Sequence, residues 1–280
     1  MKLTTSARTL TVVAAVALVA VASCGGDDDD GTTAATDGEI QLIQEGTLTV
    51  CTHLPYEPFQ YQDESGEVVG FDVDLLQLLA DDLGAEQEII NVGEWEQVTS
   101  GAVFAAGRCD IGMGAMTITE ERAEALVISD PYFDATQALI VRTDSGVEGL
   151  EDLEGELVGV QTGTTGQDYG EAHADEFGYT TQNFEDLALQ LNALKAGQVA
   201  AAINDNVPIL AFVEENPDTE MVTEFDTGEQ YGFPAKKNDP NAERLIARLN
   251  ELLAQAFEDG TYEEIYEKWF GVQPGETSGD

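Results

Sequence analysis

The sequence predicts an α/β protein with two similar lobes, each a mostly parallel sheet flanked by helices. Residues 46–112 show the order strand, helix, strand, helix, strand at lengths typical of a βαβαβ parallel unit. A second copy of this plan begins after an extended run at 137–141, and the roughly 240 residues that follow the N-terminal segment exceed one average domain. Two chain crossings, near 131–136 and 227–232, should join the lobes as a hinge and leave a ligand site between them.

The elements of the first lobe follow from local patterns. A β-branched run after Gly46 indicates a strand, and an apolar face that includes Val73, Leu76 and Leu79 indicates a helix that stops at Gly84. The expected elements are, in order, a strand at 46–52, an aromatic loop at 53–59, a helix at 70–83, a strand at 88–92 and a helix at 95–106.

A short internal sequence repeat indicates that the second lobe has the same plan. The runs 104–111 and 194–201 each place a helix end, a glycine and a strand in succession, and 155–161 resembles the opening strand. The remaining expected elements are a strand-like segment at 221–237 and amphipathic helices at 242–257 and 262–270. The resulting boundaries are residues 44–133 and 232–271 for lobe 1 and 138–229 for lobe 2.

The N-terminal segment has the features of an export signal. Residues 1–23 place two basic residues before an uncharged apolar run that is short for a membrane span. Residues 21–24, Val-Ala-Ser-Cys, are similar to a bacterial lipobox, in which the chain is cut before Cys24 and that cysteine is lipidated; a plain secretory signal is the alternative. Residues 24–43 are polar and acidic and are expected to form a flexible tether.

Charge excludes several partners. The chain has 55 Asp and Glu against 11 Lys and Arg, and its formal net charge is −44. Nucleic acids and anionic membrane surfaces are therefore poor partners. Such a surface would suit a saline exterior, where screening relaxes self-repulsion. The sequence indicates no cofactor and no metal site, and we expect a monomer.

Three cysteines are present, at positions 24, 51 and 109. Cys51 and Cys109 lie at or beside expected strands of the first lobe, and an exported protein can form a disulfide. Two buried free thiols remain the alternative. Neither cysteine has the histidine partner that a nucleophilic cysteine needs.

The run from Gly112 to Arg122 predicts half of a binding site. A buried strand passes through a short turn into a helix, with Thr119 as the N-cap. Helical side chains tilt toward the N-terminus, so Arg122 should reach back over the carboxyl end of the strand, where Thr117 also lies. A guanidinium there can hold a carboxylate. The alternative is a surface ion pair with Glu120 or Glu121.

Several runs together resemble the family 3 extracellular solute-binding proteins, the polar amino-acid receptors of ABC importers. The resemblance covers about residues 44–271. It implies a periplasmic-binding-protein-like fold of type II, with two lobes and a two-strand hinge. The runs that carry it are Gly70-Phe-Asp-Val-Asp-Leu with Leu79, Ala80 and Leu83, then Tyr56-Glu-Pro-Phe59, Thr117-Ile-Thr-Glu-Glu-Arg122, Ser129-Asp-Pro-Tyr132, Gly159-Val-Gln-Thr-Gly-Thr164, and Asp259-Gly-Thr-Tyr with Tyr266-Glu-Lys-Trp-Phe-Gly271.

The resemblance also implies roles for individual residues. Arg122 would hold the α-carboxylate of an amino acid, with Thr117 and Thr165 helping through backbone N–H groups. The turn before Thr165 opens a helix, where anion binding is physically sensible. Asp205 would take the α-ammonium group, with the carbonyl of Ala115 as a second acceptor. Asp205 could instead be a helix N-cap.

The side chain of the ligand would lie between two aromatic residues, Tyr56 and Trp95, which could alternatively belong to the core of the lobe. Gln161 would line the same region and offer both a donor and an acceptor. The sequence departs from the family at His53, which is often Asp in relatives that bind basic side chains. A basic ligand is therefore in doubt, and His53 could also be a hydrogen-bonded strand-end histidine without a role in binding.

The leading functional prediction is a lipid-anchored, extracytoplasmic receptor that closes on a polar amino acid and docks on a membrane permease. An enzyme on the same scaffold, such as a dehydratase, is the main alternative. The sequence lacks the motifs G-x-S-x-G and H-E-x-x-H and has only two histidines. The ligand-binding portion of a sensor or channel is a third class, which would need transmembrane helices after the lobes.

Overall fold

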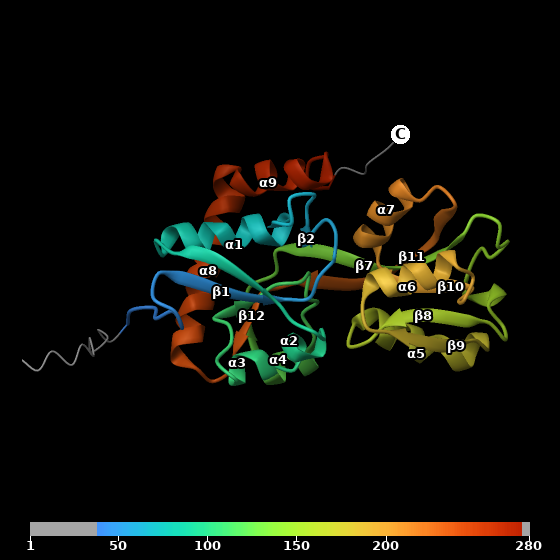
Figure 1. Cartoon of the computed structure of the whole chain (residues 1–280), viewed down its shortest axis with the longest axis horizontal. Helices are drawn as coiled ribbons and strands as arrows, with labels where there is room; N and C mark the ends of the chain where they lie inside the picture. Colours follow the sequence, from blue (N-terminus) through green and yellow to red (C-terminus); the bar gives the residue numbers. More distant parts are fainter. Residues whose placement is uncertain (1–37, 276–280) are drawn as a thin grey trace, which may run out of the picture. The chain divides into compact units, whose positions relative to one another are not determined.

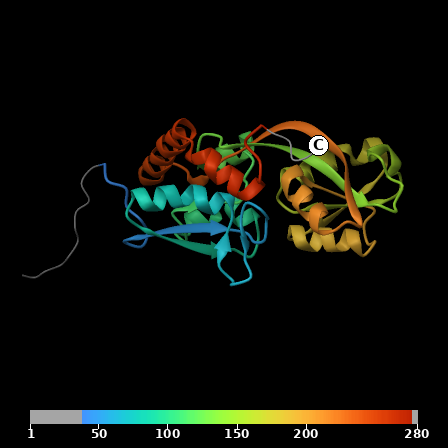
Figure 2. The same cartoon turned by 90° about the horizontal axis from the view of Figure 1, so that it is seen from above.

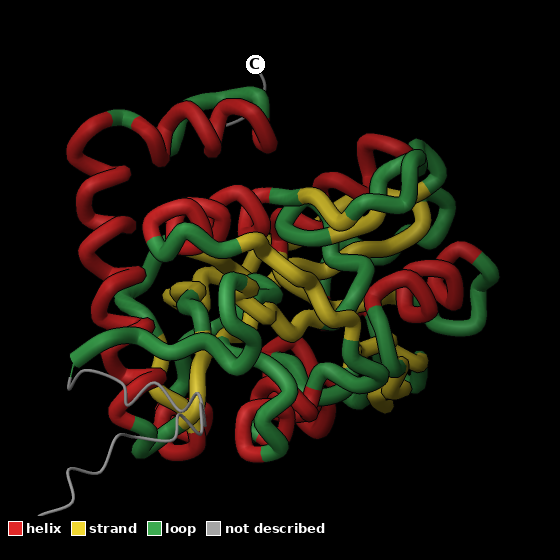
Figure 3. Tube along the Cα trace, turned by 60° about the vertical axis from the view of Figure 1, so that its left-hand side comes forward, coloured by secondary structure: helices red, strands yellow, loops and turns green. Residues whose placement is uncertain are grey.

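The computed structural model describes residues 38–275, and this part contains two five-stranded sheets and a small two-stranded sheet (Figure 1). Strands lie in the interior and helices surround them (Figure 3). No helix of this part is long and apolar enough to cross a membrane. The expected signal at 1–23, Cys24 and most of the tether lie outside the described residues.

The sheet of lobe 1 has the strand order β4-β1-β5-β12-β6. Strand β1 pairs in parallel with β4 and β5, while β12 runs antiparallel to β5 and β6. The strands are β1 (Thr47–Thr52), β4 (Glu86–Asn91), β5 (Ile111–Gly112), β6 (Leu126–Ile128) and β12 (Pro234–Lys236), and the separate pair is β2 (Tyr61–Gln62) and β3 (Val68–Val69).

The sheet of lobe 2 has the order β11-β7-β10-β8-β9. Strands β8, β9 and β10 pair in parallel, whereas β7 is antiparallel to both β10 and β11. The strands are β7 (Phe133–Arg142), β8 (Leu157–Gln161), β9 (Thr180–Phe184), β10 (Ala201–Asp205) and β11 (Thr219–Tyr231).

The expectation of mostly parallel sheets is therefore too simple, because each sheet is mixed. The antiparallel strands are those that carry the chain between the lobes or back into lobe 1. Strands β7 and β11 pair with each other along their length and run between the two lobes (Figure 2). Their register shifts between Phe225 and Glu229, so β11 is irregular in the segment that the sequence assigned to the hinge.

The helices cover the outer faces of the sheets. The expected helix at 95–106 is instead two short helices, because Gly101 adopts a left-handed conformation between them. The helices are α1 (Phe71–Asp82), α2 (Glu96–Thr99), α3 (Ala102–Ala105), α4 (Glu120–Ala125), α5 (Thr165–Phe177), α6 (Leu187–Lys195), α7 (Asn206–Glu215), α8 (Pro240–Asp259) and α9 (Thr261–Phe270), with a 3-10 turn at Leu150–Asp152.

Helix α1 is fixed in place by its first residues. Gly70 has a φ of 146°, and a Cβ there would lie 2.1 Å from the carbonyl oxygen of Phe59, so only glycine fits. Phe71 follows it and is fully buried. Its ring makes edge-on contacts with Phe59 and Phe133, which joins the loop after β1, helix α1 and strand β7 in one aromatic cluster.

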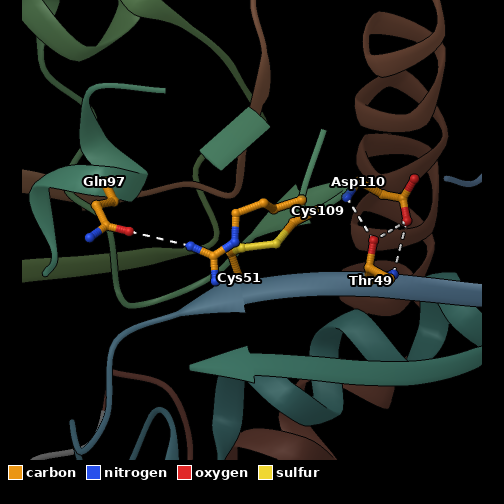
Figure 4. Close-up of a disulfide and its surroundings, with 6 residues drawn as sticks. Thr49, Cys51, Gln97, Cys109 and Asp110 are labelled. Atoms are coloured by element: carbon orange, nitrogen blue, oxygen red, sulfur yellow. Dashed lines mark hydrogen bonds between the residues drawn. A yellow bond between two sulfur atoms is a disulfide. The ribbon is translucent and has the colours of Figure 1, made fainter. Parts of the chain in front are cut away.

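Cys51 and Cys109 form a disulfide with a Cα–Cα distance of 5.7 Å (Figure 4). The bond connects β1 to the residues just before β5. Beside it, the Asp110 carboxylate accepts hydrogen bonds from the backbone and hydroxyl of Thr49. Two adjacent strands of lobe 1 are thus connected both covalently and by a buried polar pair.

The Asp72 carboxylate connects α1 to the turn that follows β5. It accepts hydrogen bonds from the backbone N–H groups of Gly114 and Ala115, at 3.0 and 2.8 Å, and from the hydroxyl of Tyr132 at 2.7 Å. Ala115 has a φ of 48°, an uncommon conformation for a residue with a side chain. The carboxylate therefore holds a strained turn at the end of a central strand.

We expect Asp72→Ala to reduce the free energy of unfolding by about 2–4 kcal/mol, because it leaves two buried N–H groups and a buried hydroxyl without a partner. Asp81→Ala, on the exposed side of the same helix, is the control and should change stability by less than about 0.5 kcal/mol. Urea denaturation followed by circular dichroism measures both. Equal effects of the two substitutions would contradict a special role for Asp72.

Candidate functional site

One pocket collects residues from both lobes, and all nine residues predicted to bind ligand line it. Sequence reasoning missed three of its lining residues. The predicted members are His53, Tyr56, Trp95, Ala115, Thr117, Arg122, Gln161, Thr165 and Asp205, and the additional members are Gln60, Gly114 and Thr164.

Arg122 is placed by the start of α4. The hydroxyl of Thr119 accepts the backbone N–H of Arg122 and caps the helix, as the sequence indicates. The guanidinium donates to the carbonyl of Thr117 at 2.8 Å and, across to lobe 2, to the carbonyl of Gly163 at 3.1 Å. The structure contains no ion pair of Arg122 with Glu120 or Glu121 among its described residues.

Burial lowers the pKa of the Arg122 guanidinium, and the charge of Asp205 opposes this effect. Arginine nevertheless keeps its charge under all ordinary conditions. The pocket therefore contains a fixed cation that is not neutralised by a direct carboxylate contact, which makes it able to attract an anionic group.

Asp205 lies at the carboxyl end of β10 and is 5 % exposed. It occupies the N-cap position of α7, but its side chain makes no capping bond. Its carboxylate instead accepts hydrogen bonds from Tyr56 at 2.8 Å, Tyr231 at 2.5 Å and Gln137 at 2.5 Å. Burial and the charge of Glu229 raise the pKa of Asp205 to about 6.

Tyr56 and Trp95 are buried members of the core and also line the pocket. A place in the core of the lobe is therefore compatible with a place beside the ligand. The Tyr56 hydroxyl lies 2.7 Å from the Asn204 side-chain oxygen of lobe 2. The ring of Trp95 packs so closely on Gly114 that a Cβ there would lie 2.6 Å from it.

Thr117 and Thr165 meet across the pocket, with their hydroxyl oxygens 3.3 Å apart. Thr165 is the first residue of α5, whose N-terminus is capped by Thr164. The backbone N–H groups at such a helix start favour negative charge. The hydroxyls and the helix start thus belong to the same end of the pocket as Arg122.

Glu229 is a residue of this neighbourhood that the sequence analysis did not identify. Its carboxylate accepts hydrogen bonds from the hydroxyls of Thr117 and Thr165, each at 2.9 Å, and from Gln137. The only available signal was its place in the segment assigned to the hinge. Its position beside the pocket depends on the irregular register of β11, which no local pattern indicates.

Across residues 38–275, no group of three or more His, Cys, Asp or Glu side chains could hold a metal ion.

Comparison with known proteins shows the family to which the chain belongs. Residues 48–272 match the family described as bacterial extracellular solute-binding proteins, family 3. The ABC transporter glutamine-binding protein GlnH of Bacillus subtilis (strain 168) is 31 % identical over 214 residues, which cover 76 % of each chain. This protein belongs to the family 3 extracellular solute-binding proteins.

Solved structures show the same two-lobed fold. An ancestral arginine-binding protein bound to arginine matches with a TM-score of 0.74 and 38 % identity, over 81 % of this chain and 99 % of the other. The ancestral amino acid-binding protein AncCDT-1, a precursor of cyclohexadienyl dehydratase, matches with a TM-score of 0.71 and 35 % identity, over 80 % of this chain and 96 % of the other.

We expect Glu229→Gln to lower the pKa of Asp205 from about 6, because it removes the negative charge that disfavours ionisation of the neighbouring carboxyl group. Carbon-detected NMR titration of the aspartate carboxyl groups measures this directly. Glu220→Gln, on the exposed face of the same strand, is the control and should leave the titration unchanged. An unchanged midpoint in Glu229→Gln would show that burial alone sets the pKa.

Proposed function

We propose that this protein is the extracytoplasmic substrate-binding receptor of an ABC importer, which closes its two lobes on a free polar amino acid and delivers it to a membrane permease. The observation that carries the proposal is the placement of Arg122 and Asp205. Of the described residues that line the pocket, Arg122 provides the guanidinium and Asp205 the sole carboxylate. The two groups come from different lobes and face the same pocket.

A free α-amino acid has one carboxylate and one ammonium group, which match this pair of charges. Arg122 would hold the carboxylate, with Thr117 and Thr165 helping through their backbone N–H groups. The N–H group of Thr165 lies at the start of α5. Asp205 and the carbonyl of Ala115 would hold the ammonium group. Each charge is costly to bury without a partner, so the zwitterion supplies what the pocket needs.

Closure follows from the same arrangement. Tyr56 and Arg122 of lobe 1 already bond to Asp205 and Gly163 of lobe 2. A ligand that contacts both lobes adds contacts that exist only when the lobes are together, and it therefore selects the closed state. Strands β7 and β11 are the connections about which the lobes would move.

Lipid attachment at Cys24 is part of the proposal and is supported by the lipobox-like run at 21–24 and the polar tether that follows it. The anchor would keep the receptor at the outer surface of the cell membrane, within reach of its permease. We further propose that the protein acts as a monomer without a cofactor.

An enzymatic role on the same scaffold is less well supported by the site. A general acid must donate a proton to its substrate. Asp205 has a raised pKa, but two hydroxyls and an amide group all donate to its carboxylate. This arrangement suits an acceptor for an ammonium group, and family relatives such as GlnH are binding proteins.

Either Arg122→Ala or Asp205→Ala should weaken amino-acid binding by about 3–5 kcal/mol, because each leaves a buried charge of the ligand unmatched. Arg122→Lys should also bind poorly, since an ammonium group cannot form the bidentate contact. Arg108→Ala removes an exposed arginine outside the pocket and is the control. Isothermal titration calorimetry measures the affinities.

The same calorimetric assay can be run with ligand analogues that lack one of the two charges. The amine that lacks the carboxylate and the acid that lacks the amine should each bind far more weakly than the parent amino acid. If either analogue binds within about threefold of the parent, a difference under 1 kcal/mol, then the assigned pairing of charges is wrong.

For the anchor, we expect protein made in a bacterial host that processes lipoproteins to begin at Cys24 and to carry lipid there. Stable retention requires more than one acyl chain, because a single chain binds membranes reversibly. Mass spectrometry of the intact protein and its N-terminal peptide tests this. Cys24→Ser should abolish the lipid mass, and an unlipidated N-terminus at another residue in the parent would rule the anchor out.

A further inference from the structure

We propose that the side chain this pocket selects is an uncharged carboxamide, that of glutamine or asparagine. The inference rests on the proposed function, because it assumes that the main-chain groups of an amino acid occupy Arg122 and Asp205. It concerns the remaining polar groups of the pocket, which belong to His53, Gln60 and Gln161.

Charge is the first argument. Once Arg122 and Asp205 are matched by the carboxylate and ammonium group of the ligand, the described lining contains no further carboxylate, lysine or arginine. The nearby Glu229 is bonded to Thr117 and Thr165, which lie at the carboxylate end of the pocket. A charged ligand side chain would therefore be buried without a direct counter-charge, which is costly.

The tautomer of the neutral His53 ring is fixed by its neighbour. Its Nδ1 lies 3.0 Å from the backbone oxygen of Val92. A carbonyl oxygen can only accept, so Nδ1 carries the proton, and in the neutral ring Nε2 is an acceptor. Nε2 is buried and has no hydrogen-bond partner among the described residues. It thus offers an unused acceptor to an N–H group.

The orientation of Gln161 is fixed by a chain of amide groups. Gln190 donates its Nε2 to the carbonyls of Gly159 and Ile203, so its oxygen faces Asn204 as an acceptor. Asn204 must then present its nitrogen to Gln190, and the same nitrogen also donates to the Gln161 oxygen at 3.3 Å.

The other end of Asn204 supports this assignment, because its oxygen accepts from the backbone N–H of Asp205 at 2.9 Å. The Gln161 oxygen is therefore occupied. Its Nε2 group has no partner among the hydrogen bonds of the described residues, and it remains available to donate to a carbonyl oxygen.

Gln60 supplies the third group. It is 1 % exposed, and its side-chain oxygen is buried without a partner. No hydrogen bond of the described residues fixes either end of this amide, so it can present an acceptor or a donor. Buried polar groups without partners are uncommon, and two at one pocket, His53 Nε2 and Gln60 Oε1, indicate that a ligand completes them.

These groups match one side-chain chemistry. A carboxamide has an NH₂ group for the acceptors of His53 and Gln60 and a carbonyl oxygen for the donor of Gln161. A carboxylate has no N–H for His53 Nε2, and an apolar chain satisfies none of the three groups. A carboxamide is also flat, as a group between Tyr56 and Trp95 should be.

The test is calorimetry of the intact protein with L-glutamine, L-asparagine, L-glutamate, L-arginine, L-lysine and L-methionine, followed by the other standard amino acids. The better of glutamine and asparagine should bind at least about tenfold more tightly than each charged amino acid and methionine, a difference of about 1.4 kcal/mol. Equal or tighter binding of arginine, lysine or glutamate would overturn the carboxamide assignment and leave the proposed function intact. Failure of every amino acid to bind would overturn both.

A substitution separates specificity from general binding. Gln161→Met removes the free N–H group at similar length, so it should reduce the preference for the carboxamide over methionine by about tenfold. Gln198→Met, at an exposed position, should leave that preference unchanged. If Gln161→Met weakens glutamine, asparagine and methionine by the same factor, Gln161 has only a structural role and the assignment fails.

Discussion

The buried carboxylate of Asp72 is the constraint on which the site of lobe 1 depends. It lies in the first turn of α1 and receives hydrogen bonds from Gly114, Ala115 and Tyr132. These partners belong to the turn after β5 and to the chain just before β7. The Asp72 side chain therefore connects helix α1 to the wall of the pocket and to a strand that crosses between the lobes. Gly70 permits this arrangement by letting the backbone of α1 approach Phe59.

This placement has an energetic cost that depends on pH. Desolvation raises the pKa of Asp72 to about 6, although all three donors act to lower it. The pKa of Asp72 is higher in the folded protein than in the unfolded chain. The carboxyl group therefore stabilises the fold most below about pH 4, and this contribution decreases as the pH rises through 6. At neutral pH the carboxylate therefore contributes less stability than at about pH 4, but it still provides the partner for two buried N–H groups and a buried hydroxyl.

Much of the fold and site could be predicted because the signals are local. The position of Arg122 can be predicted from nearby residues alone. The signals are the helix cap at Thr119, the strand end before it and the tilt of helical side chains toward the N-terminus. The partner strands of β12 and the irregularity in β11 depend on residues far apart in sequence, so the mixed sheets and the position of Glu229 could not be predicted. The orientation of Gln161 depends on a network that spans β8, α6 and β10.

The disulfide also bears on how the chain can acquire its structure. It closes a loop of 58 residues, a length at which such a bond stabilises a protein by about 4 kcal/mol in the chain-entropy model. It cannot persist in a reducing cytosol, so the tie between β1 and β5 would form only after export. Three cysteines allow three different single bonds, and acylation of Cys24 would remove two of them. Under the proposed lipid attachment, oxidative folding outside the cell has one pair of thiols left to join and needs no isomerase to correct it.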